Sequence, residues 1–321
     1  MNYPSISVVI PLYNKKLSIT RAVTSVLSQT VKDFELIIID DGSDDGSGDT
    51  ISSIKDSRLR IITQPNRGEG EARNVGILAA RNTLIAFLDA DDEWMPHFLA
   101  TAIDMVARFP SAGAFATSYV SCLNGIIERY DYRGVCNNYE GELISSFFKS
   151  VTNGANIICS SAVVIPRTVF DDVGLFCKDR MTGIDQDMWI RIALKYPIAW
   201  SPIEAAIYHL SAENRHAGKK VQRDMPYAGR LENVIRKKSY PKEMTYWIKE
   251  YLVRHRLILA YVNLDHREYR DVRTLVMNTR KTRRFRARWF SLAVMGYLPN
   301  TVGKFAGRIV WAIAYKCGAR Y

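Results

Sequence analysis

The stretch Thr83–Asp92, TLIAFLDADD, decides the fold of this chain of 321 residues. It joins a short apolar run to a cluster of aspartates, which is typical of a buried strand whose carboxyl end carries polar side chains. Two earlier stretches have the same form. The run Ile6–Ile10 is followed closely by Tyr13-Asn14, and Phe34–Ile39 runs into Asp40-Asp41.

Segments with helical spacing separate these strands, and the alternation predicts βαβ units in a mostly parallel sheet flanked by helices. The predicted helices of the first hundred residues are Leu17–Thr30, Gly46–Lys55 and Glu69–Arg81, and a further strand is Leu59–Thr63. In the second half we predict strands over Ala112–Ser121, Ile126–Asp131, Ile158–Ile165 and Ile203–Leu210, and a helix over Ile184–Lys195. Ligands bind at the carboxyl ends of parallel strands, so the polar strand ends predict a binding site.

Charge divides the chain into two parts. Hydrophobic residues make up 47% and charged residues 24%, which excludes a disordered chain. From Ala228 onward, 21 Lys and Arg stand against 6 Asp and Glu, a net charge of +15, whereas the preceding part carries −4 of the total of +11. We therefore predict a catalytic α/β domain over residues 1–225 and a basic helical C-terminal region over residues 226–321, with the boundary near Met225-Pro226.

No segment predicts a membrane span or a secretory signal. The longest uncharged apolar run, Trp289–Gly303, is interrupted by Pro299, and the N-terminus lacks a basic patch before a long apolar stretch. The five cysteines are scattered without a CxxC pair, which indicates reduced thiols in a cytoplasmic protein and argues against zinc.

Asp89 and Asp91 form the sharpest candidate site. Two carboxylates at i and i+2 on a loop can approach one hard cation, and oxygen ligands suit Mg²⁺ or Mn²⁺. The alternative is an acid-rich start of the helix that we expect near Pro96. His209 is a candidate metal ligand as well, although a single histidine on a strand is more often a packing residue.

Other residues suit nucleotide binding or proton transfer. Asp41 is the preferred contact for a nucleotide base, and Arg73 faces a phosphate or, alternatively, lies solvated on its helix. The segment Gly68–Asn74 lacks the third glycine of a dinucleotide fingerprint, so we reject a nicotinamide or flavin site. Asp185 or Asp187 could act as general base, with N-terminal helix capping as the alternative.

Four ordered motifs resemble glycosyltransferase family 2. They are Ser7–Asn14 (SVVIPLYN), Ile39–Ser43 (IDDGS), Gln64–Gly68 (QPNRG) and Phe87–Asp92 (FLDADD). The resemblance covers roughly Ser5 to Asn214. It implies a single-domain GT-A fold, with a Rossmann-like mostly parallel sheet, and an enzyme that inverts the anomeric centre of the transferred sugar.

The resemblance also implies residue roles at the donor. It places Pro11, Tyr13 and Asp41 at the nucleotide base and Arg73 on the phosphate side. It matches Asp89-Ala90-Asp91 to the DxD motif, with Asp91 as direct ligand of Mn²⁺ or Mg²⁺ and Asp89 near the ribose.

Two positions depart from the family pattern. Asp185 matches the second letter of the family's Glu-Asp pair, the implied base, but the Glu position holds Ile184, which keeps Asp187 as the alternative acid. The family's Tyr-Arg-x-His follows the last strand, whereas His209 stands directly after Tyr208.

The basic region suggests contact with a membrane. Arg280–Arg288 places six cations in nine residues, and aromatic and aliphatic residues, Trp311 among them, follow as far as Ala314, interspersed with Lys304, Arg308 and Lys316. Such a pattern predicts helices in an anionic membrane interface. The alternative is a helical subdomain packed on the core with a solvated basic face.

Together these observations predict a metal-dependent inverting glycosyltransferase. Its donor would be a nucleotide sugar, with UDP favoured, and its acceptor a hydroxyl of a saccharide or lipid-linked saccharide in cell-surface polysaccharide synthesis. We expect it on the inner face of the cell membrane, without a nucleic-acid partner. The alternatives are an inactive GT-A scaffold, a nucleic-acid-binding protein that acts through the basic tail, and a sugar-phosphate nucleotidyltransferase, whose Gly-rich loop after the first strand is missing.

Overall fold

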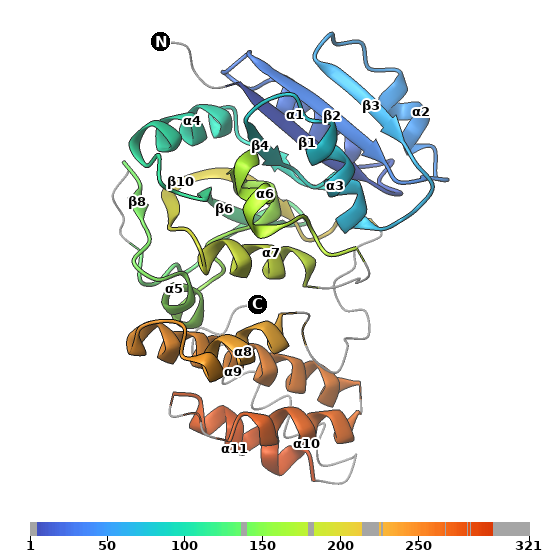
Figure 1. Ribbon diagram of the computed structural model, residues 1–321. Helices are drawn as coiled ribbons and strands as arrows, with labels where there is room; N and C mark the ends of the chain where they lie inside the picture. The colour runs from blue at the N-terminus through green and yellow to red at the C-terminus, as the bar shows by residue number, and fades with distance from the viewer. Residues whose placement is uncertain are drawn as a thin grey trace. The chain divides into compact units, whose positions relative to one another are not determined.

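The apolar run Ile6–Leu12 forms strand β1, which lies inside a ten-stranded sheet (Figure 1). The computed structural model describes residues 5–135, 140–178, 183–213, 225, 227–266, 268–280, 282 and 284–297. The chain separates into two units: residues 1–130, 135–147 and 156–215 form the first, and residues 131–134, 148–155 and 216–321 form the second.

The sheet of the first unit has the strand order β3-β2-β1-β4-β9-β6-β10-β5, with β7 paired to β6 and β8 to β10. Its strands are β1 (Ile6–Leu12), β2 (Phe34–Asp40), β3 (Leu59–Thr63), β4 (Leu84–Phe87), β5 (Glu93–Trp94), β6 (Ala114–Leu123), β7 (Ile126–Arg129), β8 (Glu142–Leu143), β9 (Val163–Pro166) and β10 (Ile198–His209). Strands β1 to β4 pair in parallel, as do β6 and β10, whereas β9 is antiparallel to both of its neighbours. The predicted fold class, an α/β fold with a mostly parallel sheet flanked by helices and a basic helical C-terminal region, is confirmed.

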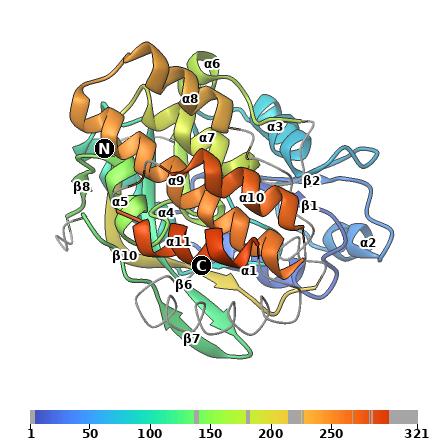
Figure 2. The same ribbon diagram turned by 90° about the horizontal axis from the view of Figure 1, so that it is seen from below.

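Helices cover both faces of this sheet, as Figures 1 and 2 show for α1 and α3, which lie on opposite sides of β1 and β2. The helices of this unit are α1 (Ile19–Leu27), α2 (Ser47–Ser52), α3 (Glu69–Ala79), α4 (Phe98–Arg108), α6 (Arg167–Val173) and α7 (Ile184–Ala193). Coverage on both faces explains why Val8, Val9 and Ile10 are all fully buried in consecutive positions of β1.

One predicted strand is wrong in its first half. Ile158–Ile165 was expected to be extended throughout, but Ser160–Ala162 form a short 3₁₀ turn and the strand begins only at Val163. The turn brings Ser161 under the end of β4, where its hydroxyl and carbonyl groups bond Asp92 and Trp94. The apolar sequence alone does not distinguish these two backbone states.

Glycines let α3 approach its neighbours closely. A Cβ added to Gly76 would lie 2.3 Å from Cγ1 of Val9 on β1, and one added to Gly70 would lie 2.3 Å from the carbonyl oxygen of Cys177. A side chain at either position would push the helix away. The contact at Gly70 fixes the N-terminal turn of α3 against the segment that precedes α7. Candidate site residues lie on both α3 and α7.

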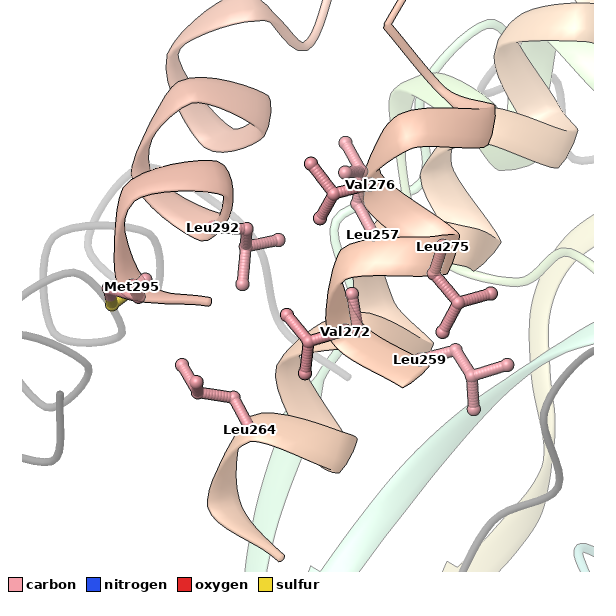
Figure 3. Close-up of a cluster of buried hydrophobic side chains, with 9 residues drawn as sticks. Leu257, Leu259, Leu264, Val272, Leu275, Val276, Leu292 and Met295 are labelled. Atoms are coloured by element: carbon pink, nitrogen blue, oxygen red, sulfur yellow. The ribbon is translucent and has the colours of Figure 1, made fainter. Parts of the chain in front are cut away.

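The second unit is helical, as the sequence predicts for the basic region. Its helices are α5 (Phe147–Asn153, all but its first residue), α8 (Ala228–Lys237), α9 (Lys242–Asp265), α10 (Tyr269–Asn278) and α11 (Arg286–Met295). Figure 3 shows the apolar cluster in which α9, α10 and α11 meet, which comprises Leu257, Leu259, Ala260, Leu264, Val272, Leu275, Val276, Leu292 and Met295. Burial of these side chains stabilises the unit.

Polar contacts reinforce this cluster. Nε1 of Trp289 donates to the carbonyl oxygen of Val276 at 2.8 Å, and the Thr282 hydroxyl donates to the buried Glu250 carboxylate at 3.0 Å. Of the helices in the described part of the chain, none is long and apolar enough to cross a membrane. The predicted tail residues Lys304, Arg308, Trp311 and Lys316, and Pro226 at the predicted domain boundary, lie outside the described residues.

Candidate active site

The polar ends of β2, β1 and β4 meet at one edge of the sheet because these three strands are adjacent and parallel. The backbone N–H of Asp41 donates to the Leu12 carbonyl oxygen at 2.8 Å, and that of Leu88 donates to the Val9 carbonyl oxygen at 3.2 Å. The three motifs that are separated in sequence therefore lie side by side, as the rule for parallel sheets predicts.

Asp41 organises the loop between β3 and α3. Its buried carboxylate accepts hydrogen bonds from the side-chain amide of Gln64 at 2.6 Å and from the backbone N–H groups of Arg67 at 2.9 Å and Gly68 at 2.8 Å. Pro11 is partly exposed near the end of β1, and Tyr13, just beyond it, is 36% exposed. The carboxylate of Asp41 thus shapes the loop after β3, and in the strand order β2 stands between β3 and the strand β1 that carries Pro11.

Arg73 lies at the centre of the charged cluster. Its side chain is 2% exposed, and its guanidinium contacts Asp89 at 2.7 Å and Glu69 at 2.5 Å while lying 5.4 Å from the ring centre of Phe176. Burial opposes the charge, but the two carboxylates dominate and raise the pKa of Arg73. The alternative prediction of a solvated Arg73 is therefore wrong, because Gly76 and Gly70 draw α3 onto its neighbours.

The aspartates after β4 have three different environments. Asp89 is bound by Arg73, and Oδ2 of Asp91 accepts from Nζ of Lys15 at 2.6 Å. Ala90 between them is buried. Asp92 is fully buried and bonds the Ser161 hydroxyl and the backbone N–H of His209, and burial, together with the charges of Asp89 and Asp91, raises its pKa well above the ordinary range.

His209 presents an imidazole nitrogen with no hydrogen-bond partner among the described residues. Its buried Nε2 lies 3.5 Å from Oε1 of Glu93, too far for a good hydrogen bond. Burial, followed by the positive charge of Arg21, lowers the pKa of His209, which favours the neutral form that ligates metals.

The donor chemistry fits a divalent cation that also binds phosphate. Asp89 and Asp91 supply carboxylate oxygens and His209 supplies a neutral nitrogen, yet the described residues contain no ready-made cluster of three such groups. Mg²⁺ and similar ions are commonly held by one or two carboxylates, with substrate phosphates completing the coordination. The residues present match that incomplete type of site.

Asp185 and Asp187 lie in the first turn of α7 but differ in their surroundings. Asp187 is buried and its Oδ2 accepts from Nε of Arg191 at 2.8 Å, an ion pair within the helix. The Asp185 carboxylate accepts from the backbone N–H of Gln186, and its pKa is raised by burial, against the lowering effect of Arg73. The charges of Arg73 and Asp89 also act on the pKa of Asp185. The preceding residue Ile184 lies against Gly70 in the first turn of α3, since a Cβ added there would be 3.4 Å from Cγ2 of Ile184.

Several members of the cluster were not assigned from the sequence. Glu69, at the start of α3, has a pKa that Arg73 lowers but that burial and nearby carboxylates raise overall, although its side chain is 38% exposed. Lys15 and Asp92 also went unassigned. A charged residue beside a glycine at the start of a helix was the only available signal for Glu69, and Lys15 gave none.

Comparisons with known proteins agree with this geometry. The sequence model of Glycosyl transferase family 2 matches residues 7–174, just over half of the chain. An uncharacterized glycosyltransferase of Rickettsia conorii is 34% identical over 207 residues, which cover 62% of this chain and 32% of the relative. The chain spans about a third of the length of the first curated relatives that it matches.

Two further relatives have more specific names. WfaP of Escherichia coli, a UDP-Glc:alpha-D-GlcNAc-diphosphoundecaprenol beta-1,3-glucosyltransferase, is 42% identical over 191 residues, which cover 59% of this chain and 70% of WfaP. The succinoglycan biosynthesis protein ExoW of Rhizobium meliloti is 34% identical over 186 residues, which cover 52% of this chain and 57% of ExoW.

The fold is shared with a solved structure. Residues 1–349 of S. aureus TarS, in complex with UDP-GlcNAc, superpose with a TM-score of 0.63 at 17% sequence identity, and the match covers 90% of this chain and 79% of that structure. At this identity the match shows a common fold, which agrees with the GT-A fold that the resemblance to glycosyltransferase family 2 implies.

Proposed function

The chain belongs to glycosyl transferase family 2, and on this premise we propose that it transfers a sugar from a nucleotide-sugar donor to a hydroxyl group of a saccharide acceptor. The observation that carries the proposal is the convergence of Asp89, Asp91, Arg73 and Asp185 at the carboxyl edge of a parallel sheet. A cluster of carboxylates around one buried arginine suits a cation that binds the diphosphate and a general base.

Asp185 is the proposed general base. It takes the proton of the acceptor hydroxyl as that oxygen forms a bond to the anomeric carbon, while the bond from this carbon to the diphosphate oxygen breaks and its electron pair leaves with the nucleotide. A single displacement of this kind inverts the anomeric centre. Burial raises the pKa of Asp185 and makes its carboxylate a stronger base, and Arg73 keeps the carboxylate ionised.

Asp91 and Asp89, with the imidazole of His209, would hold the proposed Mn²⁺ or Mg²⁺ ion. When bound, such an ion neutralises negative charge on the departing diphosphate. Arg73 contributes from this chain by fixing the orientation of Asp89 and by adding a permanent positive charge beside it.

The proposed donor is a UDP-sugar. WfaP is named for UDP-Glc, and TarS was solved with UDP-GlcNAc. Pro11 and Tyr13 would line the base, with Asp41 holding the loop opposite them, and Ala90 leaves room beside the sugar because it carries only a methyl group. The name of WfaP also supports a lipid-linked saccharide as acceptor, and that of ExoW supports a role in polysaccharide synthesis.

A lipid-linked acceptor would suit a protein that rests on the inner face of the membrane. On α11 and the turn after it, Phe290, Val294 and Tyr297 recur at helical spacing and are 64%, 43% and 71% exposed, with the exposed Arg286 one turn before them. Exposed aromatic side chains beside arginines are typical of interfacial helices on anionic lipid. The double variant Phe290→Ser/Tyr297→Ser should lower flotation with vesicles rich in phosphatidylglycerol, while vesicles of phosphatidylcholine alone give little binding to either protein.

The reaction is tested by measuring UDP release from a panel of UDP-sugars with a diphosphate-linked GlcNAc acceptor. Asp185→Asn should lower kcat by about 10²- to 10⁴-fold and leave donor affinity nearly unchanged, since it removes only the base. Asp187→Asn is the matched contrast and should weaken folding while the folded fraction keeps its kcat. Equal kcat in wild type and Asp185→Asn would refute the assignment of the base.

A further inference from the structure

Lys15 forms an ion pair with Asp91, the carboxylate that the proposed function assigns to a divalent cation. Its ammonium lies 2.6 Å from Oδ2 of Asp91, and the two side chains are 12% and 16% exposed. Of the described residues, Lys15 is the one whose charge pairs with the Asp91 carboxylate; the neighbouring Arg21 bonds the backbone carbonyl of Asp91 and faces Glu93 instead. A pair with so little exposure is screened less by solvent than a surface ion pair.

A second contact holds this lysine in place. Nζ of Lys15 also donates to the backbone carbonyl oxygen of Glu213 at 2.5 Å. The Glu213 carboxylate accepts from the backbone N–H groups of Leu17 and Ser18 and from the Ser18 hydroxyl at 3.0, 3.1 and 2.6 Å. The segment that follows β10 is thereby fastened to the loop after β1, and the ammonium is held at Asp91 from two sides.

We propose that Lys15 is a resident counter-cation of Asp91, which a divalent cation has to displace. An ammonium and a doubly charged ion repel each other at this distance, and the repulsion is strong where water is scarce. The unliganded protein therefore binds the cation weakly by itself, and binding breaks the contact between Lys15 and Asp91. The inference rests on the proposed role of Asp91 as cation ligand.

The test measures Mn²⁺ affinity of the full chain without nucleotide, by electron paramagnetic resonance of free Mn²⁺, and again with UDP. Lys15→Met keeps the length of the side chain and removes its charge, so it should bind Mn²⁺ alone at least about fivefold tighter than wild type, the lower end of ordinary coupling between sites. Lys15→Arg keeps the charge, and Lys16→Met removes an exposed neighbouring lysine. Both should stay within about twofold of wild type.

A measurement on the unaltered protein covers the case in which Lys15→Met does not fold. Titration of Mg²⁺ into wild type labelled at the lysine ε-carbons should move the resonance of Lys15, assigned with Lys15→Arg, and leave that of Lys16 in place. Equal Mn²⁺ affinity of wild type and Lys15→Met, or an unmoved Lys15 resonance at saturating Mg²⁺, overturns the role of Lys15 alone. Absence of cation binding to every variant, with and without UDP, overturns the role of Asp91 in the proposed function as well.

Discussion

Replacing Arg73 by methionine tests whether one buried cation holds the candidate site together. Methionine keeps an unbranched stem against Phe176 but removes the guanidinium that joins Glu69 at 2.5 Å and Asp89 at 2.7 Å. The two carboxylates would then lie in a partly buried site without their shared counter-ion.

The structure sets the size of the effect. Removing one partner of a buried ion pair costs about 3–5 kcal/mol, but Glu69 is 38% and Asp89 is 23% exposed, so solvent screens part of the loss. We expect the free energy of unfolding to fall by about 3 kcal/mol at pH 7. Arg73 also lowers the pKa of Glu69 and of Asp185, so both rise further in the variant. A protein that raises the pKa of an acid on folding becomes more stable as the pH falls. The loss of unfolding free energy caused by Arg73→Met should therefore be smaller at pH 5 than at pH 7.

The assay is urea unfolding, monitored by hydrogen exchange at the backbone amides of β4, because these amides report on the first unit. Arg129→Met is the matched control, because its pair with Glu204 has a similar distance of 2.6 Å but is 72% exposed at the arginine. Solvent screens that exposed pair, so its removal should change the free energy of unfolding little. A loss for Arg73→Met that equals the loss for Arg129→Met, with no dependence on pH, would refute the reasoning.

Three further predictions concern the base, the packing of α3 and the second unit. As the pH is lowered, kcat/KM for UDP release should fall at a pH above the ordinary aspartate pKa of 3.8, because the pKa of Asp185 is raised and the base becomes protonated there. The same fall in Asp185→Asn would contradict this. Gly76→Ala should lower the free energy of unfolding by about 1–3 kcal/mol through its clash with Val9, and Val9→Ala in the same chain should recover part of it; additive losses in urea unfolding would exclude the clash. Burial, then the charge of Arg254, lowers the pKa of His255 from 6.5 to about 3. The second unit should therefore lose stability as the pH falls below 6.5, by roughly 3 kcal/mol at pH 4.5, and His255→Phe should abolish this slope in hydrogen exchange at the amides of α9.

The order of strands and helices in the first unit follows from local pattern. Continuous apolar runs such as Ile6–Ile10 can be satisfied only inside a sheet that is covered on both faces, and the polar residues that end them then meet at one edge. For this reason the neighbourhood of Asp41, Asp89 and Asp91 could be predicted without coordinates. The roles of Pro11, Tyr13, Asp185 and His209 at that edge remain predictions.

Tertiary structure alone decided which charges face each other. The pairing of Lys15 with Asp91 joins residues 76 positions apart, and the buried place of Arg73 depends on two glycines that let α3 approach β1 and the loop after α6. The turn at Ser160–Ala162 places the Ser161 hydroxyl on Asp92 and the Ser161 carbonyl oxygen on Nε1 of Trp94, contacts between residues 67 and 69 positions apart. The spacing of apolar residues in the sequence indicates which residues face the core. The partner of a buried charge depends instead on strand order and packing distance, which are properties of the whole fold.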